Sequence, residues 1–182
     1  MDFRDATPAD APLIASLHAQ SWRHAYAHFM TADWLASDIE AERLAIWTPK
    51  LATPRPGQRV IIAQRGGEAI GFTCVIGGAD PRWGTLVDNL HALKSARGSG
   101  VGTALLDQAA RWAMTDWANV PIHLWCFTDN VAARGFYAAR GGEEVETCDK
   151  PAHDGHKRSE KRIAWRDPGT LISPPANGRG NK

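Results

Sequence analysis

Apolar positions in the first part of the chain recur with the period of an α-helix. Residues 13–21 place their apolar side chains on one helix face, and residues 7–10 open that helix with an N-cap and a proline. A capping box at residues 37–40 predicts a second helix that runs to Pro49. A short strand is expected at residues 3–6, so this part of the chain is mainly helical.

After Arg59 the pattern changes to short apolar runs that are typical of β-strands. The predicted strands are residues 60–63, 69–76, 85–93, 122–127, 143–147 and 161–165. Helical spacing returns at residues 104–113 and 130–140. The alternation predicts an α/β (α+β) protein with one domain over residues 1–167, followed by an irregular tail over residues 168–182.

A glycine-rich stretch lies between a predicted strand and a predicted helix. It consists of Arg97, Gly98, Ser99, Gly100, Val101, Gly102 and Thr103. A turn that opens a helix leaves backbone N–H groups without intrahelical acceptors, and the helix dipole favours an anion there. The stretch lacks the third glycine of the dinucleotide pattern and the Lys-Ser/Thr pair of the nucleoside-triphosphate loop. It therefore predicts a phosphate site of another type, or a helix-opening turn without a ligand.

A second motif follows the strand at residues 122–127. Asn130, Ala133 and Tyr137 belong to an N-x-x-A-x-x-F-Y pattern and form one stripe along a helix. A small residue in the middle would let an extended ligand lie against the helix between Asn130 and Tyr137. Alternatively, Asn130 is only an N-cap and Tyr137 only a core aromatic.

Together, the R-G-x-G-x-G stretch and the N-x-x-A-x-x-F-Y helix closely resemble the two signatures of the GNAT superfamily of acyl-CoA-dependent N-acyltransferases. The resemblance covers residues 59–165 well and residues 3–51 more loosely. It implies the GNAT fold, a mixed and strongly twisted sheet of about seven strands flanked by helices. In this fold the fourth and fifth strands splay apart and expose main-chain groups that can bind an extended ligand.

The resemblance also implies a binding mode for acetyl-CoA as co-substrate. The backbone of His91, Ala92 and Leu93 would take the pantetheine arm, and the amides of residues 97–103 would take the pyrophosphate. Asn130, Ala133 and Tyr137 would lie beside the arm.

The expected chemistry is direct attack of an amine on the thioester, with both substrates bound. The N–H of Ala92 would stabilise the oxyanion, and Tyr137 would protonate the leaving thiolate. The base is open between Asp88 and His91. Asp88 lies where relatives often carry an acid, and His91 has a reference pKa closer to neutrality.

The acceptor is expected to be a primary amine of a small molecule or peptide. Trp22, Tyr26 and Asp88 are candidates for its binding wall, although Trp22 and Tyr26 at helical spacing also suit a core. Two other functions stay open: a CoA-binding sensor without turnover, and a transferase of a longer acyl group.

Composition narrows the partners and the compartment. A formal net charge of +1 indicates neither nucleic acid nor an anionic membrane as partner, and no apolar run approaches the length of a membrane span. Three widely spaced cysteines favour reduced thiols and a cytoplasmic protein. His24 and His28 have metal-compatible spacing without the rest of a metal motif, so no metal is expected. A homodimer is left open, since many relatives dimerise.

Overall fold

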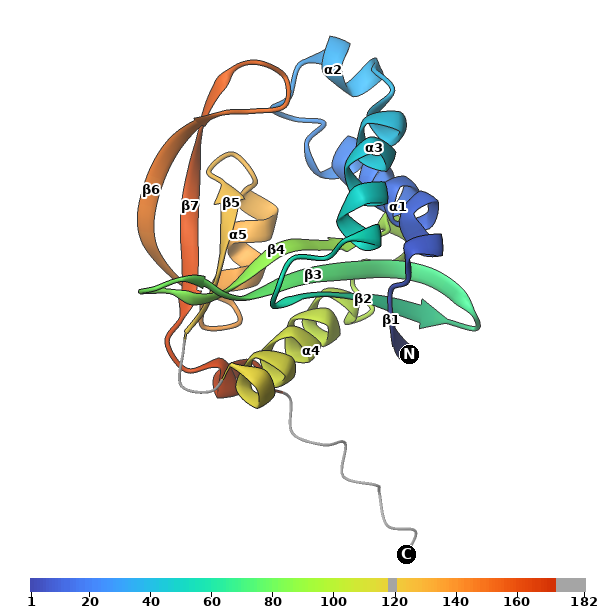
Figure 1. Cartoon of the computed structure of the whole chain (residues 1–182). Coiled ribbons are helices and arrows are strands. Elements are labelled where there is room, and N and C mark those ends of the chain that lie inside the picture. The colour runs from blue at the N-terminus through green and yellow to red at the C-terminus, as the bar shows by residue number, and fades with distance from the viewer. Residues whose placement is uncertain (118–120, 173–182) are drawn as a thin grey trace, which may run out of the picture.

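Seven strands form one mixed sheet between two layers of helices (Figure 1). The computed structural model describes residues 1–117 and 121–172. The strands are β1 (Asp2–Asp5), β2 (Gln58–Arg65), β3 (Glu68–Asp80), β4 (Gly84–Ala92), β5 (Ile122–Phe127), β6 (Glu143–Pro151) and β7 (Lys157–Trp165). The α-helices are α1 (Ala11–Ala25), α2 (Ala32–Ala36), α3 (Ile39–Ala52), α4 (Val101–Asp116) and α5 (Val131–Ala138).

The sheet has the strand order β1-β2-β3-β4-β5-β7-β6. Its neighbouring strands are antiparallel, except for the parallel pair β4 and β5. The tight β2–β3 hairpin depends on Gly66 and Gly67, whose φ angles of +59° and +83° suit a primed turn. The mixed seven-stranded sheet predicted from the sequence is confirmed.

The sheet opens between β4 and β5. These strands pair only through Thr85 with Ile122 and Leu86 with His123. Beyond those positions β4 stays paired with β3 on its other edge as far as Ala92, and β5 stays paired with β7 as far as Phe127. The splay predicted between the fourth and fifth strands is therefore present.

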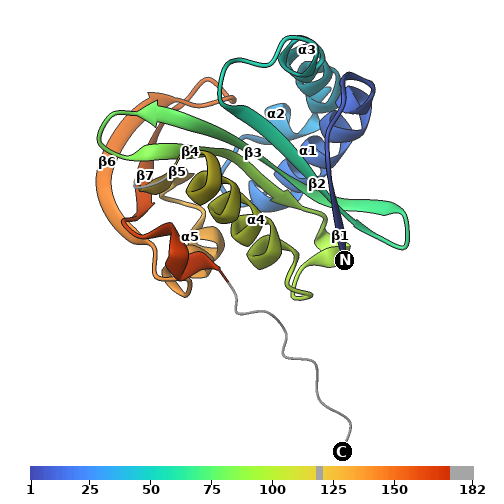
Figure 2. The ribbon, with the colours of Figure 1, turned by 60° about the horizontal axis from the view of Figure 1, so that its bottom comes forward.

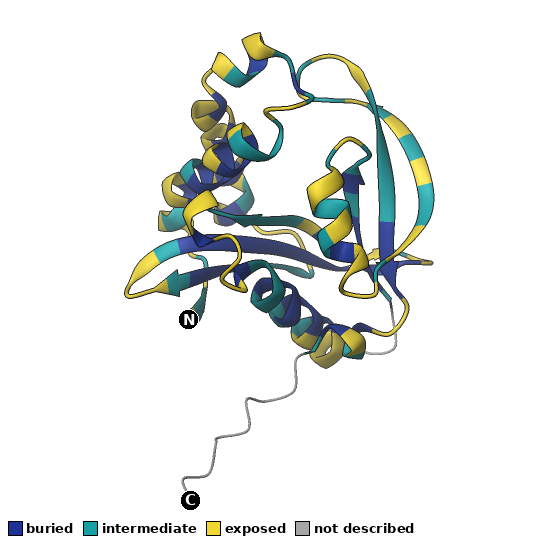
Figure 3. Ribbon diagram, turned by 180° about the vertical axis from the view of Figure 1, so that it is seen from behind, coloured by how far each residue is buried: buried dark blue, intermediate teal, exposed yellow. Residues whose placement is uncertain are grey.

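Each face of the sheet is covered by its own helices. On one face, α1 and α3 bury Ile14 and Trp47 against Phe72 of β3. On the other face, α4 buries Leu106 against Ile122 of β5 and its neighbours. Figure 2 shows α4 lying across the face opposite α1 and α3, and Figure 3 shows buried residues concentrated between these layers. The helical patterns of the sequence thus correspond to two separate packing interfaces.

The start and end of α3 differ from the prediction. The N-cap is Asp38, whose Oδ1 accepts the Ala41 amide at 3.0 Å, whereas Ser37 ends α2. The helix does not end at Pro49 but continues to Ala52. Leu51 is buried beneath α1, and this packing holds the last turn despite the amide that proline lacks.

The closing hairpin is longer than predicted. Much of the expected polar loop is strand, because β6 extends to Pro151 and β7 begins at Lys157. Charged side chains pair across the two strands, as in Lys150 with Glu160 and Lys157 with Asp149. Such cross-strand ion pairs stabilise the distal part of the hairpin, which carries no apolar pattern.

The chain continues past the predicted domain end at residue 167 with a short 3-10 helix at Pro168–Leu171. Leu171 is only 5% exposed and packs in the α4 core. Residues 173–182 of the predicted tail lie outside the described residues, so the boundary stays a prediction. Within the described ranges, no helix has the length and apolar character needed to cross a membrane.

Candidate active site

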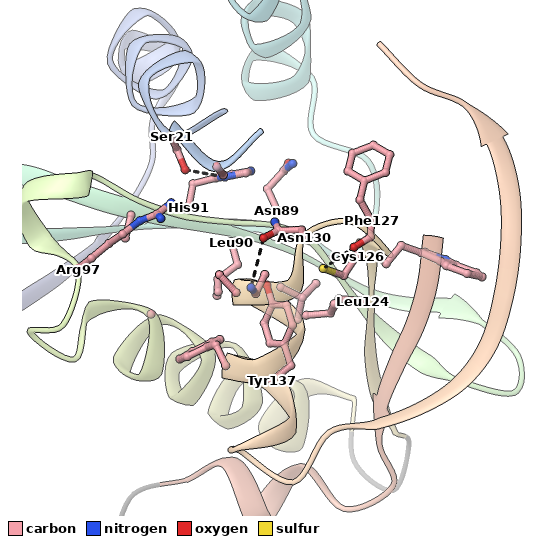
Figure 4. Close-up of a pocket in the computed structure, with 18 of the residues that line it drawn as sticks. Ser21, Asn89, Leu90, His91, Arg97, Leu124, Cys126, Phe127, Asn130 and Tyr137 are labelled. Atoms are coloured by element: carbon pink, nitrogen blue, oxygen red, sulfur yellow. Dashed lines mark hydrogen bonds between the residues drawn. The ribbon is translucent and has the colours of Figure 1, made fainter. Parts of the chain in front are cut away.

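A cavity of about 720 Å³ lies where β4 and β5 diverge. Because it passes through the splay, the cavity has two halves (Figure 4). The α4–α5 half is lined by the glycine-rich loop and by α5, and the α1 half is lined by α1 and the β6–β7 hairpin. Two ligands could therefore enter from opposite faces of the sheet and meet in the gap.

The glycine-rich loop presents free amides to the α4–α5 half. The first intrahelical hydrogen bond of α4 is that of the Ala104 amide, which donates to Gly100 O at 2.9 Å. The three amides before it, from Val101 to Thr103, lie in the first turn of the helix, where no intrahelical acceptor exists. Within the loop, the amides of Arg97 and Ser99 are bonded internally to Lys94 and Ala96.

The glycines of this loop have two different roles. Gly98 and Gly100 have φ angles of +73° and +82°, and a Cβ at either position would meet nothing within 4 Å. They are needed for backbone conformation. Gly102 has no such angle, but a Cβ there would approach the Phe136 ring to 3.3 Å. It therefore allows the start of α4 to pack closely against α5.

Charge is divided between the two halves. Arg140 lies in the α4–α5 half, where its guanidinium donates to Thr103 Oγ1 at 2.5 Å, whereas the side chain of Arg97 extends from the loop towards His91 (Figure 4). The carboxylates of the described lining are Asp88 and Glu160, and both lie in the α1 half. The loop amides and Arg140 therefore favour an anion in the α4–α5 half, whereas the carboxylates of the α1 half are ion-paired, Asp88 with Lys50 and Glu160 with Lys150.

Tyr137 reaches from α5 into the gap between Leu90 and Leu124 (Figure 4). The residue is only 7% exposed and lines the cavity. Burial raises the pKa of the Tyr137 phenol above its ordinary value, and the neighbouring Cys126 and Tyr26 raise it further. The hydroxyl is therefore protonated at neutral pH and can donate a hydrogen bond or proton.

Asn130 and Ala133 lie at the start of α5 and line the same half. The side chain of Asn130 caps the helix, since its Oδ1 accepts the Ala133 amide at 3.2 Å. The capping role and a place in the cavity, which the sequence left as alternatives, are combined in one residue.

The free edge of β4 faces the gap. The Leu93 amide donates to Ile70 O of the β3 side at 2.9 Å. Amides of successive strand residues point to opposite edges, so the Ala92 amide points towards the splay. Ala92 lines the cavity, as an oxyanion donor must, whereas Leu93 does not.

His91 lines the α1 half and packs against α1. Its Nδ1 lies 3.2 Å from Ser21 Oγ, and its ring centroid lies 4.3 Å from that of His18. Burial lowers the pKa of His91 to about 3, with smaller contributions from the positive charges of Arg97 and Arg43. The imidazole is therefore neutral at physiological pH and is a weak base.

Asp88 lies at a β-bulge where the β3–β4 register shifts. Cys74 pairs with Asn89 and Val75 with Val87, which leaves Asp88 without a partner in the ladder. The Asp88 carboxylate lines the cavity and forms an ion pair with Lys50 of α3 at 2.5 Å.

The structure brings most of the predicted site residues into this one cavity. Tyr26 lines the α1 half, whereas Trp22, Leu93 and Ser99 lie outside the lining. Trp22 is 4% exposed and packs in a separate core with Trp34. The Ser99 hydroxyl donates to Ala96 O and accepts from Arg65, which holds the loop in place.

The lining residues that sequence reasoning missed include Arg140, Trp125 of β5 and, on the β6–β7 hairpin, Lys150, His153 and Glu160. Arg140 lies just beyond the second motif, and its position at the end of the α5 segment could have indicated it. Nothing local to residues 150–160 pointed to a cavity, because their place depends on the strand pairing. Among residues 1–117 and 121–172, no group of three or more His, Cys, Asp or Glu side chains is arranged to hold a metal ion.

A family model described as the acetyltransferase (GNAT) family matches residues 19–141, which is most of the chain. A probable N-acetyltransferase of Mycobacterium tuberculosis is 28% identical over 138 residues, which cover 74% of this chain and 75% of that protein.

Solved structures are similar in fold. A GCN5-related N-acetyltransferase from Rhodopseudomonas palustris has a TM-score of 0.72 at 21% identity, covering 90% of this chain and 93% of that chain. PaiA N-acetyltransferase from Thermoplasma acidophilum, solved in complex with coenzyme A, has a TM-score of 0.64 at 16% identity. The match covers 88% of this chain and 98% of that chain.

The splayed mixed sheet and the divided cavity define an acyl-CoA-dependent acyltransferase. The chain belongs to the acetyltransferase (GNAT) family. This membership confirms three predictions made from the sequence: the fold, the enzyme class, and acetyl-CoA as the co-substrate.

Proposed function

We propose that the protein transfers the acetyl group of acetyl-CoA to a primary amine of a small molecule by direct attack in a ternary complex. The observation that carries this proposal is the single cavity that joins an anion-binding loop, through the splay, to a half that contains carboxylates. Arg140 and the free loop amides suit a diphosphate, and Glu160, which pairs with the ammonium group of Lys150, suits the ammonium group of an acceptor.

The α4–α5 half fits coenzyme A. The loop amides at the start of α4 lack intrahelical acceptors, and the space beside Gly98 and Gly100 is open. The pantetheine arm would lie along the free edge of β4, with Ala133 providing clearance on α5. These features support the cofactor-binding roles predicted for the loop and for the α5 motif.

The residues at the gap have separate tasks in the reaction. The Ala92 amide would stabilise the oxyanion as the amine nitrogen bonds to the thioester carbon. Tyr137 would donate its proton to sulfur as the carbon–sulfur bond breaks. The amine must lose a proton, and we assign its removal to Asp88 through water, because the lowered pKa of His91 makes that imidazole the weaker candidate. No enzyme nucleophile is required.

The activity is proposed for a reducing, cytoplasmic setting. Cys74, Cys126 and Cys148 all carry free thiols, and burial raises the pKa values of the first two to about 12. Unpaired thiols of this kind are typical of proteins that work in the cytoplasm.

The test is incubation of the full chain with acetyl-CoA and a panel of amines. Free thiol release and the acetylated amine, detected by mass spectrometry, should rise together in proportion. Tight coenzyme A binding without amine-dependent thiol release would indicate a sensor instead. Faster turnover with butyryl-CoA than with acetyl-CoA would indicate a longer acyl donor.

A further inference from the structure

The β6–β7 side of the cavity contains an ion pair in an unusual setting. Lys150 Nζ lies 2.7 Å from Glu160 Oε2 and 4.2 Å from the centroid of the Trp125 ring. All three residues line the cavity. A carboxylate beside an aromatic face is an environment that binds ammonium ions. In the structure, the ammonium group between Glu160 and Trp125 is that of Lys150.

The sheet register explains this arrangement. Glu160 of β7 lies opposite Phe127 of β5, and Trp125 is two residues back on the same strand and face. Glu160 is only 17% exposed and is therefore part of the cavity wall. Lys150 comes from β6, the edge strand of the sheet, and its side chain is 41% exposed. The carboxylate is held in place, while the lysine has a route into solvent.

We propose that Glu160 and Trp125 form the ammonium subsite for the acceptor amine, and that Lys150 occupies this subsite until the acceptor displaces it. The inference rests on the proposed function, because the acetyl donor would enter from the α4–α5 half. Displacement exchanges one ammonium ion for another, so the partly buried carboxylate of Glu160 is never left unpaired. An uncompensated charge at such a site would be strongly unfavourable.

The same geometry indicates the class of acceptor. The other carboxylate of the α1 half, Asp88, is paired with Lys50, whose ammonium also lies 4.7 Å from the Trp47 ring centroid. Lys50 does not line the cavity, so it has no place in the exchange. The described lining thus offers one exchangeable ammonium position.

Around this position the walls are aromatic: Tyr26, Trp125 and Phe127 line the α1 half. A flat apolar body packs well against such walls. The acceptor is therefore a monocationic amine on an apolar, ring-sized body, and not a polyamine, whose second cation would meet no open carboxylate in the described lining.

Calorimetric binding of phenethylamine to the full chain, without any acyl donor, tests the subsite independently of turnover. Lys150→Met keeps the length of the side chain and removes the competing charge. It should tighten binding roughly fivefold or more, because the subsite is no longer occupied. Adding Glu160→Gln to this variant should weaken binding about tenfold relative to Lys150→Met alone.

Matched controls separate local from general effects. Lys157 lies on the same hairpin, is 73% exposed and pairs with Asp149. Lys157→Met makes the same change in net charge away from the cavity and should leave phenethylamine binding unchanged. The alcohol 2-phenylethanol should not respond to Glu160→Gln, and spermidine should bind less tightly than phenethylamine. Lys150→Gln repeats the main test with a polar neutral side chain.

Equal or weaker phenethylamine binding by both Lys150 variants would overturn the proposal. So would an unchanged affinity after the Glu160 substitution, or tighter binding of spermidine. The expected binding pattern together with no acetyl transfer to any amine would leave the subsite intact and reject the proposed function. Acetyl transfer to an amine, together with unchanged phenethylamine affinity in the Lys150 and Glu160 variants, would support the proposed function and reject the subsite.

Discussion

The two tyrosines of the chain line one cavity from opposite halves. Tyr137 lies on α5, and Tyr26 follows the end of α1. Burial raises the pKa values of both phenols, so both are protonated at neutral pH. Both tyrosines thus offer a protonated hydroxyl to the cavity, and they differ mainly in their position relative to the expected thioester.

Tyr137→Phe should lower kcat about a hundredfold, because it removes the group that donates a proton to the leaving sulfur. Coenzyme A affinity should change less than about threefold, since the ring and its packing remain. Steady-state kinetics and calorimetry of coenzyme A binding measure the two effects. Tyr26→Phe is the control and should retain most of kcat. Similar losses in both variants, or equal losses in turnover and affinity, would remove the acid role of Tyr137.

His91 shows how tertiary burial changes a residue that looked suited to base catalysis. Its ring lies against His18 and Ser21 of α1, and burial lowers its pKa to about 3. The unfolded chain takes up a proton on this ring near pH 6.5, whereas the folded protein does so only near pH 3. Stability is therefore lost as the pH falls through this window.

Replacing His91 with glutamine should reduce this acid sensitivity. Between pH 7 and pH 5, the free energy of unfolding of the natural protein should fall by about 2 kcal/mol more than that of His91→Gln. Urea unfolding at the two pH values measures the difference. His28→Gln, at an exposed position, should behave like the natural protein. Identical pH dependence in His91→Gln and the natural protein would show that the ring does not resist protonation in the fold.

At the scale of elements, the glycine-rich loop couples a backbone conformation to a binding surface. Gly100 is the N-cap of α4 with a φ of +82°, and Gly67 in the β2–β3 hairpin has a φ of +83°. Neither position would place a Cβ within 4 Å of another atom. The two glycines thus differ in location but not in the strain that a side chain would cause.

Gly100→Ala and Gly67→Ala should each destabilise the fold by about 1–2 kcal/mol, the cost of a left-handed L-residue. Only Gly100→Ala should also weaken coenzyme A binding, because the amides around it would turn. Thermal unfolding and calorimetry separate the two effects. If both variants bind coenzyme A as the natural protein does, the loop is not the diphosphate site.

At the scale of the whole molecule, a net charge of +1 conceals a strong local asymmetry. Arg140 and the loop amides lie in the α4–α5 half of the cavity, and Asp88 and Glu160 lie in the α1 half, each paired with a lysine. The fold thus gathers residues far apart in the chain into an anion-binding half and a half with ion-paired carboxylates. We expect this difference between the halves to orient the two substrates before they meet in the splay.

Arg140→Gln should weaken coenzyme A binding about tenfold and reduce its dependence on salt concentration, because one charge-assisted contact is lost. Calorimetric titrations at low and physiological ionic strength measure both effects. Arg82→Gln is the control, since Arg82 is 74% exposed in the β3–β4 turn and does not line the cavity. A loss of the same size in both variants would indicate only a general effect of net charge.

What the sequence determined is mostly local. The β2–β3 turn, the strand at Ile122–Phe127, the glycine-rich opening of α4 and the Asn130 cap depend on residues within a few positions of one another. Most residues of the two motifs line the α4–α5 half of the cavity, because each motif is one turn joined to one helix. Even the splay followed from them, through the family that they resemble.

Only the tertiary structure decided the rest. Whether Trp22 lines a cavity or a core, and whether His91 is a base or a neutral packing group, depends on which elements cover them. Lys150 and Glu160 reach the cavity because β7 pairs with β5, a register that no local pattern of charged residues reveals. Burial and cross-strand register depend on contacts between residues distant in the chain, and those contacts form only when the sheet assembles.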